Sequence, residues 1–384
     1  MGVKGIRKSN KKPPVLSHEF IIQNHADIIS CIMVVFVFGM LVPLTSSLCN
    51  SFVTLQYGTE ISEKMTRYGI GLKDICTIFF YSLVCIILHA IQQEYVLDKI
   101  SKKLHLSKIK TSMFNDSGQL LVFYLLLIIW SGDLIIKEDL LLNIRFLWEG
   151  YPHIYMPFLM KFFYIVQIGY WIHTYPELYF SKTKREEIPS KIKFSTINLF
   201  YVSAAYVFHF NRVGVLLLFL HSLSEGFYHF ARLFNIIDKE EKNSKIANMV
   251  SDIVFALSRI STIILSLVTF SIGLTKSEKP EIERPEGDYN TLLVRIGAFL
   301  LVVVLQLYLL FYFIRDHSKQ LREIKIPIRS LLKQQPLTQK KNESVKFSQK
   351  KKKSKNTGES ELTEADQNLK RNIHSKKGKK NLIN

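Results

Sequence analysis

Histidine and carboxylate side chains within one apolar stretch of the sequence are the residues best suited to chemistry. His221, Glu225, His229 and Arg232 follow one another at spacings of four, four and three, so a helix would place them on one face. Such side chains bind metal ions or transfer protons. However, the two histidines lie eight residues and about 12 Å apart along a helix axis, too far to bind one ion. A metal would need one adjacent pair plus ligands from elsewhere, so we expect no metal and no cofactor.

The same four residues are also consistent with a polar seam between packed helices. Ionisable groups in hydrocarbon are costly and tend to mark function. If the next apolar stretch is an antiparallel neighbour, Glu225 meets Arg259 at matching depth, and Arg232 meets Asp252 nearer the membrane surface. We predict both ion pairs, because leaving either charge unpaired would be expensive. Two interpretations stay open, a structural seam and a polar groove that also contacts a guest polypeptide or lipid.

A second polar group closes another apolar stretch, where His173 and Glu177 flank Pro176. Proline removes a backbone donor and stops or kinks a helix. This combination is consistent with a binding site on the cytosolic side, and equally with a helix end at the membrane surface and its aromatic belt. Lipid headgroups are the expected neighbours of four further polar residues, namely His89, Gln92, Gln93 and Glu94.

Membrane helices must position these residues. Hydrophobic residues make up 48% of the 384-residue chain, and they gather in stretches of about 20 residues, long enough to cross a bilayer. The run 120–130 lacks the polar face that a soluble helix would show. The predicted fold class is all-α, a polytopic membrane helix bundle of about eight transmembrane helices. They are Ile28–Leu48, Leu72–Ile91, Gly118–Ile136, Pro157–Tyr175, Ile192–Phe210, Val213–Phe234, Met249–Gly273 and Leu292–Ile314.

The basic residues predict how the bundle is oriented. Of the net charge of +19, the segment from Arg315 to Asn384 contributes 20 Lys and Arg against 7 Asp and Glu. Outside this tail, the segments predicted to be cytosolic hold 19 Lys and Arg, and the opposite loops hold 8. Positive residues stay on the cytosolic side during insertion, so both termini are predicted to be cytosolic. The Lys-rich tail has few apolar residues and is expected to be disordered.

Two local features leave alternatives open. Only Asn211 and Arg212 separate the fifth and sixth apolar stretches, which predicts either a tight helical hairpin or one irregular element. Cys49 and Cys76 stand near the same ends of neighbouring stretches and could pair, although buried free thiols are the usual case. Motifs of soluble enzymes, such as a Walker loop, a dinucleotide fingerprint, His-Glu-x-x-His or a nucleophile elbow, do not occur in the sequence.

Five segments carry a resemblance to a known family, and they are Pro13–Cys31, Phe52–Tyr57, His89–Ile100, Phe114–Leu120 and Met160–Pro189. Over roughly residues 10 to 320 the chain resembles the translocating-chain-associated membrane protein (TRAM) family. The resemblance implies a multi-pass protein of the endoplasmic reticulum membrane, with cytosolic termini and a TLC domain formed by the last six of eight helices. It also implies partners, namely the Sec61 translocation channel and nascent secretory and membrane polypeptides.

Ceramide synthases share the TLC fold, and their sequence can be compared with the residues around His221 and Glu225. The run Leu220–Glu225 resembles their His-Asp-x-x-Asp run, with Ser222 in place of the first acid and Glu225 as the second, and their paired histidines are missing here. The resemblance therefore implies the fold without acyl transfer, in a non-enzymatic accessory factor. The main alternative is a TLC-fold membrane protein that binds or modifies lipids; a transporter is a third, for which the sequence shows no clear repeat.

The sequence thus predicts four parts. They are a cytosolic N-terminal segment (1–27), the first two transmembrane helices with a lumenal and a basic cytosolic loop (28–116), a TLC-like six-helix membrane domain (117–321) and the disordered basic tail (322–384). Phospholipids are expected partners of the bundle, and ribosomes are the expected partners of the tail. No specific nucleic acid is expected, because no folded reader motif accompanies the charge.

Overall fold

A computed structural model describes residue 14 and residues 17–62, 65–181, 183–238, 242–282, 287–315 and 317–318. The chain divides into a compact unit, Met1–Leu310, and a second unit, Phe311–Asn384, of which only 311–315 and 317–318 are described. The predicted disordered tail therefore lies outside the described residues.

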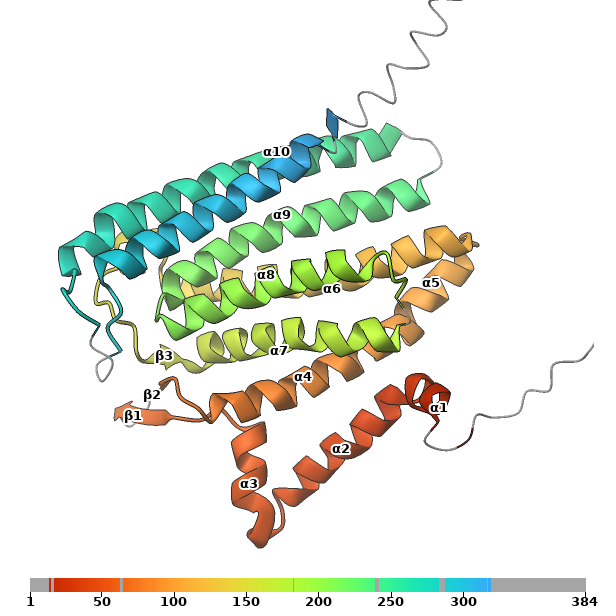
Figure 1. Cartoon of the computed structure of the whole chain (residues 1–384), viewed down its shortest axis with the longest axis horizontal. Helices are drawn as coiled ribbons and strands as arrows, with labels where there is room; N and C mark the ends of the chain where they lie inside the picture. The colour runs from red at the N-terminus through yellow and green to blue at the C-terminus, as the bar shows by residue number, and fades with distance from the viewer. Residues whose placement is uncertain are drawn as a thin grey trace, which may run out of the picture. The chain divides into compact units, whose positions relative to one another are not determined.

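Helices dominate the first unit (Figure 1). Three short strands form one antiparallel sheet in the order β1–β2–β3. In chain order the elements are α1 (His18–Gln23), α2 (His25–Gly39), α3 (Pro43–Val53), β1 (Gly58–Ser62), β2 (Met65–Tyr68), α4 (Asp74–Ile91), the π-helix η1 (Gln92–Leu97), α5 (Asp98–Lys103), α6 (Lys108–Lys137), the 3-10 helix η2 (Ile144–Leu147), β3 (Met156–Pro157), α7 (Phe158–Phe180), α8 (Ile188–Val207), α9 (Asn211–Ile237), α10 (Lys242–Leu267), the π-helix η3 (Val268–Gly273) and the 3-10 helix η4 (Leu274–Ser277). A C-terminal helix, Leu292–Arg315, follows.

Helices long and apolar enough to cross a membrane confirm a helical multi-pass membrane protein. Within the described residues there are five, and they are Asp74–Lys103, Lys108–Lys137, Asn211–Ile237, Asn243–Ser277 and Leu292–Arg315. Two more predicted spans are the helices α7 and α8, of 23 and 20 residues. Both contain several polar residues, including Lys161 and Gln167 in α7 and Lys191 in α8.

The first predicted span, Ile28–Leu48, is not one continuous helix. It is divided between α2 and α3, with a break at 40–42. The break has a local cause, because Pro43 lacks a backbone N–H and is suited to the first turn of a helix rather than its interior. The Thr45 hydroxyl donates to the Gly39 carbonyl (2.8 Å) and satisfies the end of α2. In Figure 1, α3 runs across the direction of the long helices.

The end of α7 and the connection between α8 and α9 bear on two further predictions. The sequence predicted either a stop or a kink at Pro176. α7 continues through this proline to Phe180, so of these two alternatives the stop is wrong. The proline costs α7 a single backbone bond, and the helix tolerates that loss for one further turn. Between α8 and α9 only residues 208–210 intervene, which confirms the tight hairpin. His209 adopts a left-handed backbone there (φ 58°), a conformation suited to a sharp turn.

The long helices pack side by side around one apolar core. Close pairs are α4 with α7, α7 with α8, α6 with α9 and α9 with α10. Tyr124, Phe163, Tyr164 and Leu134 are almost completely buried in this core. A Cβ atom at Gly169 of α7 would lie 3.1 Å from a backbone nitrogen of α4, so glycine permits this close helix contact. The core thereby fixes α6, α9 and α10 relative to one another.

Candidate functional site

Arg259 of α10 is the centre of a buried polar cluster. Its Nη2 donates to the Ser224 Oγ (2.9 Å) and lies 3.5 Å from Glu225 Oε1, both on α9. Its Nη1 donates to Gln306 Oε1 on the C-terminal helix (3.1 Å). The arginine is only 4% exposed and also lies over the Phe255 ring. The predicted Glu225–Arg259 ion pair is confirmed, and three helices meet at it.

Tyr124 of α6 extends this cluster along α9. Its ring packs edge-on against His221 (6.1 Å between centroids) and stacks on His229 (5.9 Å, 14° between planes). Both predicted histidines thus face α6 and lie on either side of one tyrosine. The Tyr124 hydroxyl, His221 Nε2 and His229 Nδ1 are buried, and no hydrogen-bond partner for them occurs in the part of the chain that the structure describes. The side chains of His221, Glu225, His229, Arg259, Ser224, Gln306 and Tyr124 are hereafter called the polar seam.

The polar seam does not have the composition of a metal centre. The described residues contain no group of three or more His, Cys, Asp or Glu side chains that could hold a metal ion. The seam instead offers a guanidinium, a carboxylate and further hydrogen-bonding groups among α6, α9, α10 and the C-terminal helix. Such a set can hydrogen-bond a polar group inside the membrane.

The second predicted ion pair joins Arg232 to Asp252. Arg232 and Asp252 lie on the neighbouring helices α9 and α10, and each is half-buried. Their pairing stays a prediction.

His173 and Glu177 belong to a different cluster, between α4 and α7. His89 Nε2 of α4 lies 3.4 Å from Glu177 Oε1, and its ring lies 5.6 Å from the His173 ring. His173 is 1% exposed, and its Nδ1 contacts the Tyr170 carbonyl. The structure therefore separates these two predicted site residues from the polar seam.

Three of the four residues expected at lipid headgroups have protein partners. Besides His89, Gln92 donates to the Gly118 carbonyl of α6 (3.1 Å), and Gln93 donates to Asp98 Oδ1 (2.6 Å). Only Glu94 is exposed as expected. The π-helix η1 inserts an extra residue into the turn at this point. These amides therefore face α5 and α6, and contact with headgroups stays a prediction for all four residues.

A third buried cluster was not predicted. Lys161 of α7 and Asp74 of α4 form an ion pair (2.7 Å) in which both side chains are almost completely buried. The Lys161 ammonium also donates to the carbonyls of Gln56 (2.8 Å) and Gly69 (2.7 Å), while the Tyr206 hydroxyl donates to Asp74 Oδ2 (2.9 Å). This cluster fastens the segment that carries β1 and β2 to the bundle. Cys49 and Cys76 nearby are both free thiols.

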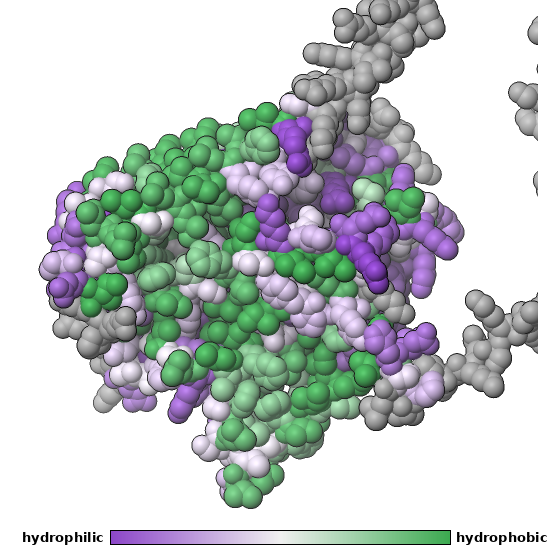
Figure 2. Space-filling view, viewed as in Figure 1, coloured by the Kyte–Doolittle hydropathy of each residue, from purple (hydrophilic) through white to green (hydrophobic). Residues whose placement is uncertain are grey.

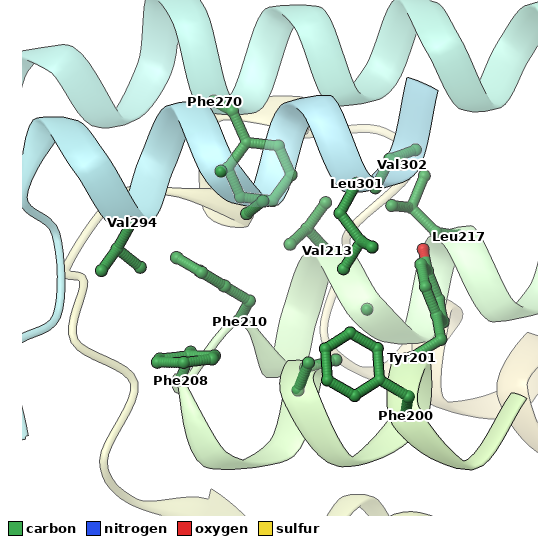
Figure 3. Close-up of a pocket in the computed structure, with 15 residues that line it drawn as sticks. Phe200, Tyr201, Phe208, Phe210, Val213, Leu217, Phe270, Val294, Leu301 and Val302 are labelled. Carbon is green, nitrogen blue, oxygen red and sulfur yellow. The ribbon is translucent and has the colours of Figure 1, made fainter. Parts of the chain in front are cut away.

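An apolar pocket of about 360 Å³ lies beyond the polar seam (Figure 3). Its walls come from α8, α9, η3 and the C-terminal helix. The Tyr201 hydroxyl is the single oxygen among the labelled side chains, and it points away from the end marked by Val294 and Phe208. The lining residues are Phe200, Tyr201, Ala204, Ala205, Phe208, Phe210, Val213, Gly214, Leu217, Phe270, Val294, Gly297, Ala298, Leu301 and Val302.

Similarity to known proteins now gives the family. A family model described as TLC domain matches residues 113–315. Translocating chain-associated membrane protein 2 of Mus musculus is 41% identical over 320 residues, covering 83% of this chain and 86% of that protein, and its Homo sapiens counterpart is 39% identical over the same coverage. The chain belongs to the translocating chain-associated membrane protein family. The resemblance identified from the sequence is thereby confirmed.

More distant relatives match a shorter part of this chain. ASC1-like protein 3 of Oryza sativa is 26% identical over 168 residues, 44% of this chain and 56% of that protein. Ceramide synthase LOH2 of Arabidopsis thaliana is 23% identical over 168 residues, 41% of this chain and 54% of that protein. The TLC match includes the polar seam and the apolar pocket, whereas Asp74 and His89 lie before it.

Proposed function

We propose that this protein is a non-enzymatic accessory factor of the channel that moves proteins into and across the endoplasmic reticulum membrane. Its family, and its long apolar helices, support a multi-pass protein of that membrane. The proposal further assigns it cytosolic termini, and as partners the Sec61 channel, nascent secretory and membrane chains, phospholipids and, for the basic tail, ribosomes. The observation that carries it is the 41% identity to a translocating chain-associated membrane protein along most of both chains.

The polar seam suggests how such a protein would act. A signal sequence or transmembrane segment gains about 25 cal/mol for each Å² of apolar surface moved into lipid, whereas its polar groups resist that transfer. The seam presents Arg259, Glu225 and two histidines inside the bundle. It would give polar groups of the guest a partner at mid-depth while apolar helix faces accept the rest.

Site-specific photocrosslinking tests this function directly. A stalled nascent chain with a photoreactive signal sequence is presented to microsomes that contain the protein. We expect crosslinks to the protein, and fewer of them with Glu225→Leu or His221→Leu. Unchanged crosslinking by both folded variants would assign the seam a purely structural role. Failure of the unaltered protein to crosslink to any nascent chain would count against the function itself.

A lipid-modifying enzyme is the alternative that one comparison favours, because ceramide synthase LOH2 is 23% identical to this chain over 168 residues. In that case His221 or Glu225 would act as the base. The seam argues against it, because Glu225 is engaged by Arg259 and Ser222 stands where the synthase run has an acid. Purified protein supplied with acyl-CoA and sphingoid base should form no acyl product; product formation that depends on His221 would establish the enzyme.

A further inference from the structure

A dense group of lysines lies where α5 ends and α6 begins. All five side chains are exposed, and no acidic residue occurs between the first and the last of them. Figure 2 shows hydrophilic side chains gathered at this end of the bundle, whereas the sides of the long helices are mostly hydrophobic. The segment 99–110 is hereafter called the basic turn. Its lysines are Lys99, Lys102 and Lys103 on α5, and Lys108 and Lys110 in the first turn of α6.

Buried neighbours hold the basic turn in place. Leu97 and Phe114, on either side of it in the sequence, are almost completely buried and form an apolar cluster with Ile236 at the end of α9. The Asp98 carboxylate accepts a hydrogen bond from the Asn115 side chain of α6 (3.2 Å). This bond ties α5 to α6 and turns the nearest acidic side chain toward the protein. The lysines therefore present their charge outward from a packed part of the bundle.

Helix length places the basic turn at a membrane surface. The helices Asp74–Lys103 and Lys108–Lys137 each have 30 residues, about 45 Å of helix. A bilayer measures about 30 Å across its hydrocarbon core and about 40–45 Å with its headgroup layers. Helices of this length that cross the membrane end among the headgroups on both sides. The lysines at the joined ends of these two helices therefore lie at the level of the lipid phosphates.

Exposed apolar side chains stand among the lysines and favour lipid over RNA as the partner. Lys99 Nζ lies over the Tyr95 ring, 5.2 Å from its centroid, and Ile109 is 73% exposed between two lysines. Such a mixture is stabilised at the boundary of headgroups and acyl chains. Arginine, which stacks on unpaired RNA bases, does not occur between residues 92 and 117. The exposed apolar residues are Tyr95, Val96, Ile100, Leu104, Ile109 and Met113.

We propose that the basic turn binds the headgroups of anionic phospholipids in the cytosolic leaflet. The lysine ammonium groups donate to phosphate and carboxylate oxygens of the headgroups, while the apolar side chains enter the upper acyl region. A zwitterionic headgroup carries its own ammonium group and offers the adjacent lysines no net attraction. The proposal rests on the proposed function, which includes phospholipids among the partners, and adds where they bind and which charge they carry.

Photocrosslinking in lipid nanodiscs tests the site. A photoreactive amino acid replaces Ile109 or, as a matched control, Ile136 at the other end of α6, which is at least as exposed. The nanodiscs hold equal amounts of phosphatidylserine and phosphatidylcholine, and mass spectrometry identifies the labelled lipid. We expect a several-fold preference for phosphatidylserine at Ile109 and none at Ile136. The same lipid ratio at both positions would overturn the proposal and leave the proposed function intact, because no nascent chain takes part.

Removal of charge gives an independent readout. The variant Lys108→Gln/Lys110→Gln removes two lysines of the basic turn, and Lys73→Gln/Lys276→Gln removes two exposed lysines beyond the opposite ends of α4 and α10. We expect the first variant to lower the phosphatidylserine preference at Ile109 several-fold and the second to leave it unchanged, with both as thermally stable as the parent. An equal preference in the two variants would overturn the proposal. Loss of ribosomal RNA binding in the first variant, with lipid labelling unchanged, would overturn it in favour of RNA.

Discussion

Glu225 and Arg259 approach within 3.5 Å of each other, one on α9 and one on α10, where the arginine is almost completely buried. The carboxylate is not the arginine's sole partner, because Ser224 and Gln306 also accept from it. A guanidinium held by three helices resists displacement from its neighbours. The pair therefore couples the packing of α9, α10 and the C-terminal helix to the chemistry of the polar seam.

Glu225→Leu should lower the free energy of unfolding by about 3 kcal/mol, because it leaves a buried guanidinium without its counter-charge. The double variant Glu225→Leu/Arg259→Leu should recover part of this loss, since neither charge then remains. Thermal unfolding in lipid nanodiscs, arranged as a double-mutant cycle, measures the coupling. Additive effects of the two substitutions would show that the pair contributes no specific stability.

Tyr124→Phe is expected to be neutral or slightly stabilising. The tyrosine hydroxyl is buried, and the described residues give it no hydrogen-bond partner. Removing an unsatisfied buried group does not cost a bond, and the phenyl ring keeps its contacts with His221 and His229. The measurement is the melting temperature of the two proteins in the same detergent. A loss above about 1 kcal/mol would reveal a hydrogen bond to water or lipid at this hydroxyl.

The sequence predicted the part of the seam that carries charge. Charged residues in apolar stretches stand out, and antiparallel neighbours bring groups of equal depth together, so Glu225 and Arg259 could be paired in advance. Tyr124, Ser224 and Gln306 could not be found in this way, because uncharged polar residues are common in membrane helices and do not reveal their partners. Their positions depend on which faces of α6, α9 and the C-terminal helix meet.

The Lys161–Asp74 ion pair escaped prediction for a related reason. Lys161 was evident as a charge inside a span, whereas Asp74 stands in the first turn of α4, where an acidic residue needs no partner to be explained. Only the packing of α4 against α7 brings them together. The division of the first span likewise depended on one residue, Pro43, within an otherwise apolar run.

Lys161→Met should destabilise the protein by about 3–5 kcal/mol, because it leaves Asp74 buried without its counter-charge. It should also release the segment 55–70, since Gln56 and Gly69 lose the ammonium that their carbonyls share. Limited proteolysis of this segment together with thermal unfolding checks both effects. Lys137→Met is the matched control: its ion pair with Asp133 is solvent-exposed, so its loss should cost no more than about 0.5 kcal/mol. Equal effects of the two substitutions would contradict the assignment.

His153, on the loop between α6 and α7, should make the free energy of unfolding depend on pH. Burial, and secondarily the nearby Arg212 guanidinium, lowers the pKa of this histidine to about 3. In the unfolded chain the pKa of a histidine is about 6.5. Between these values the unfolded state binds a proton that the folded state does not, so the free energy of unfolding falls as the pH is lowered from about 6.5 toward 3.

Substitution of His153 isolates this contribution from those of other groups. His153→Gln keeps a polar side chain of similar length and cannot be protonated, so its stability should decline less than that of the parent between about pH 6.5 and pH 4. The measurement is thermal unfolding of both proteins at matched pH values in the same lipid. The Asn211 side chain bonds to the backbone carbonyl of His153 (3.0 Å), so that contact survives the substitution. Parallel stability curves for the two proteins would show that His153 takes up its proton equally in the folded and unfolded states.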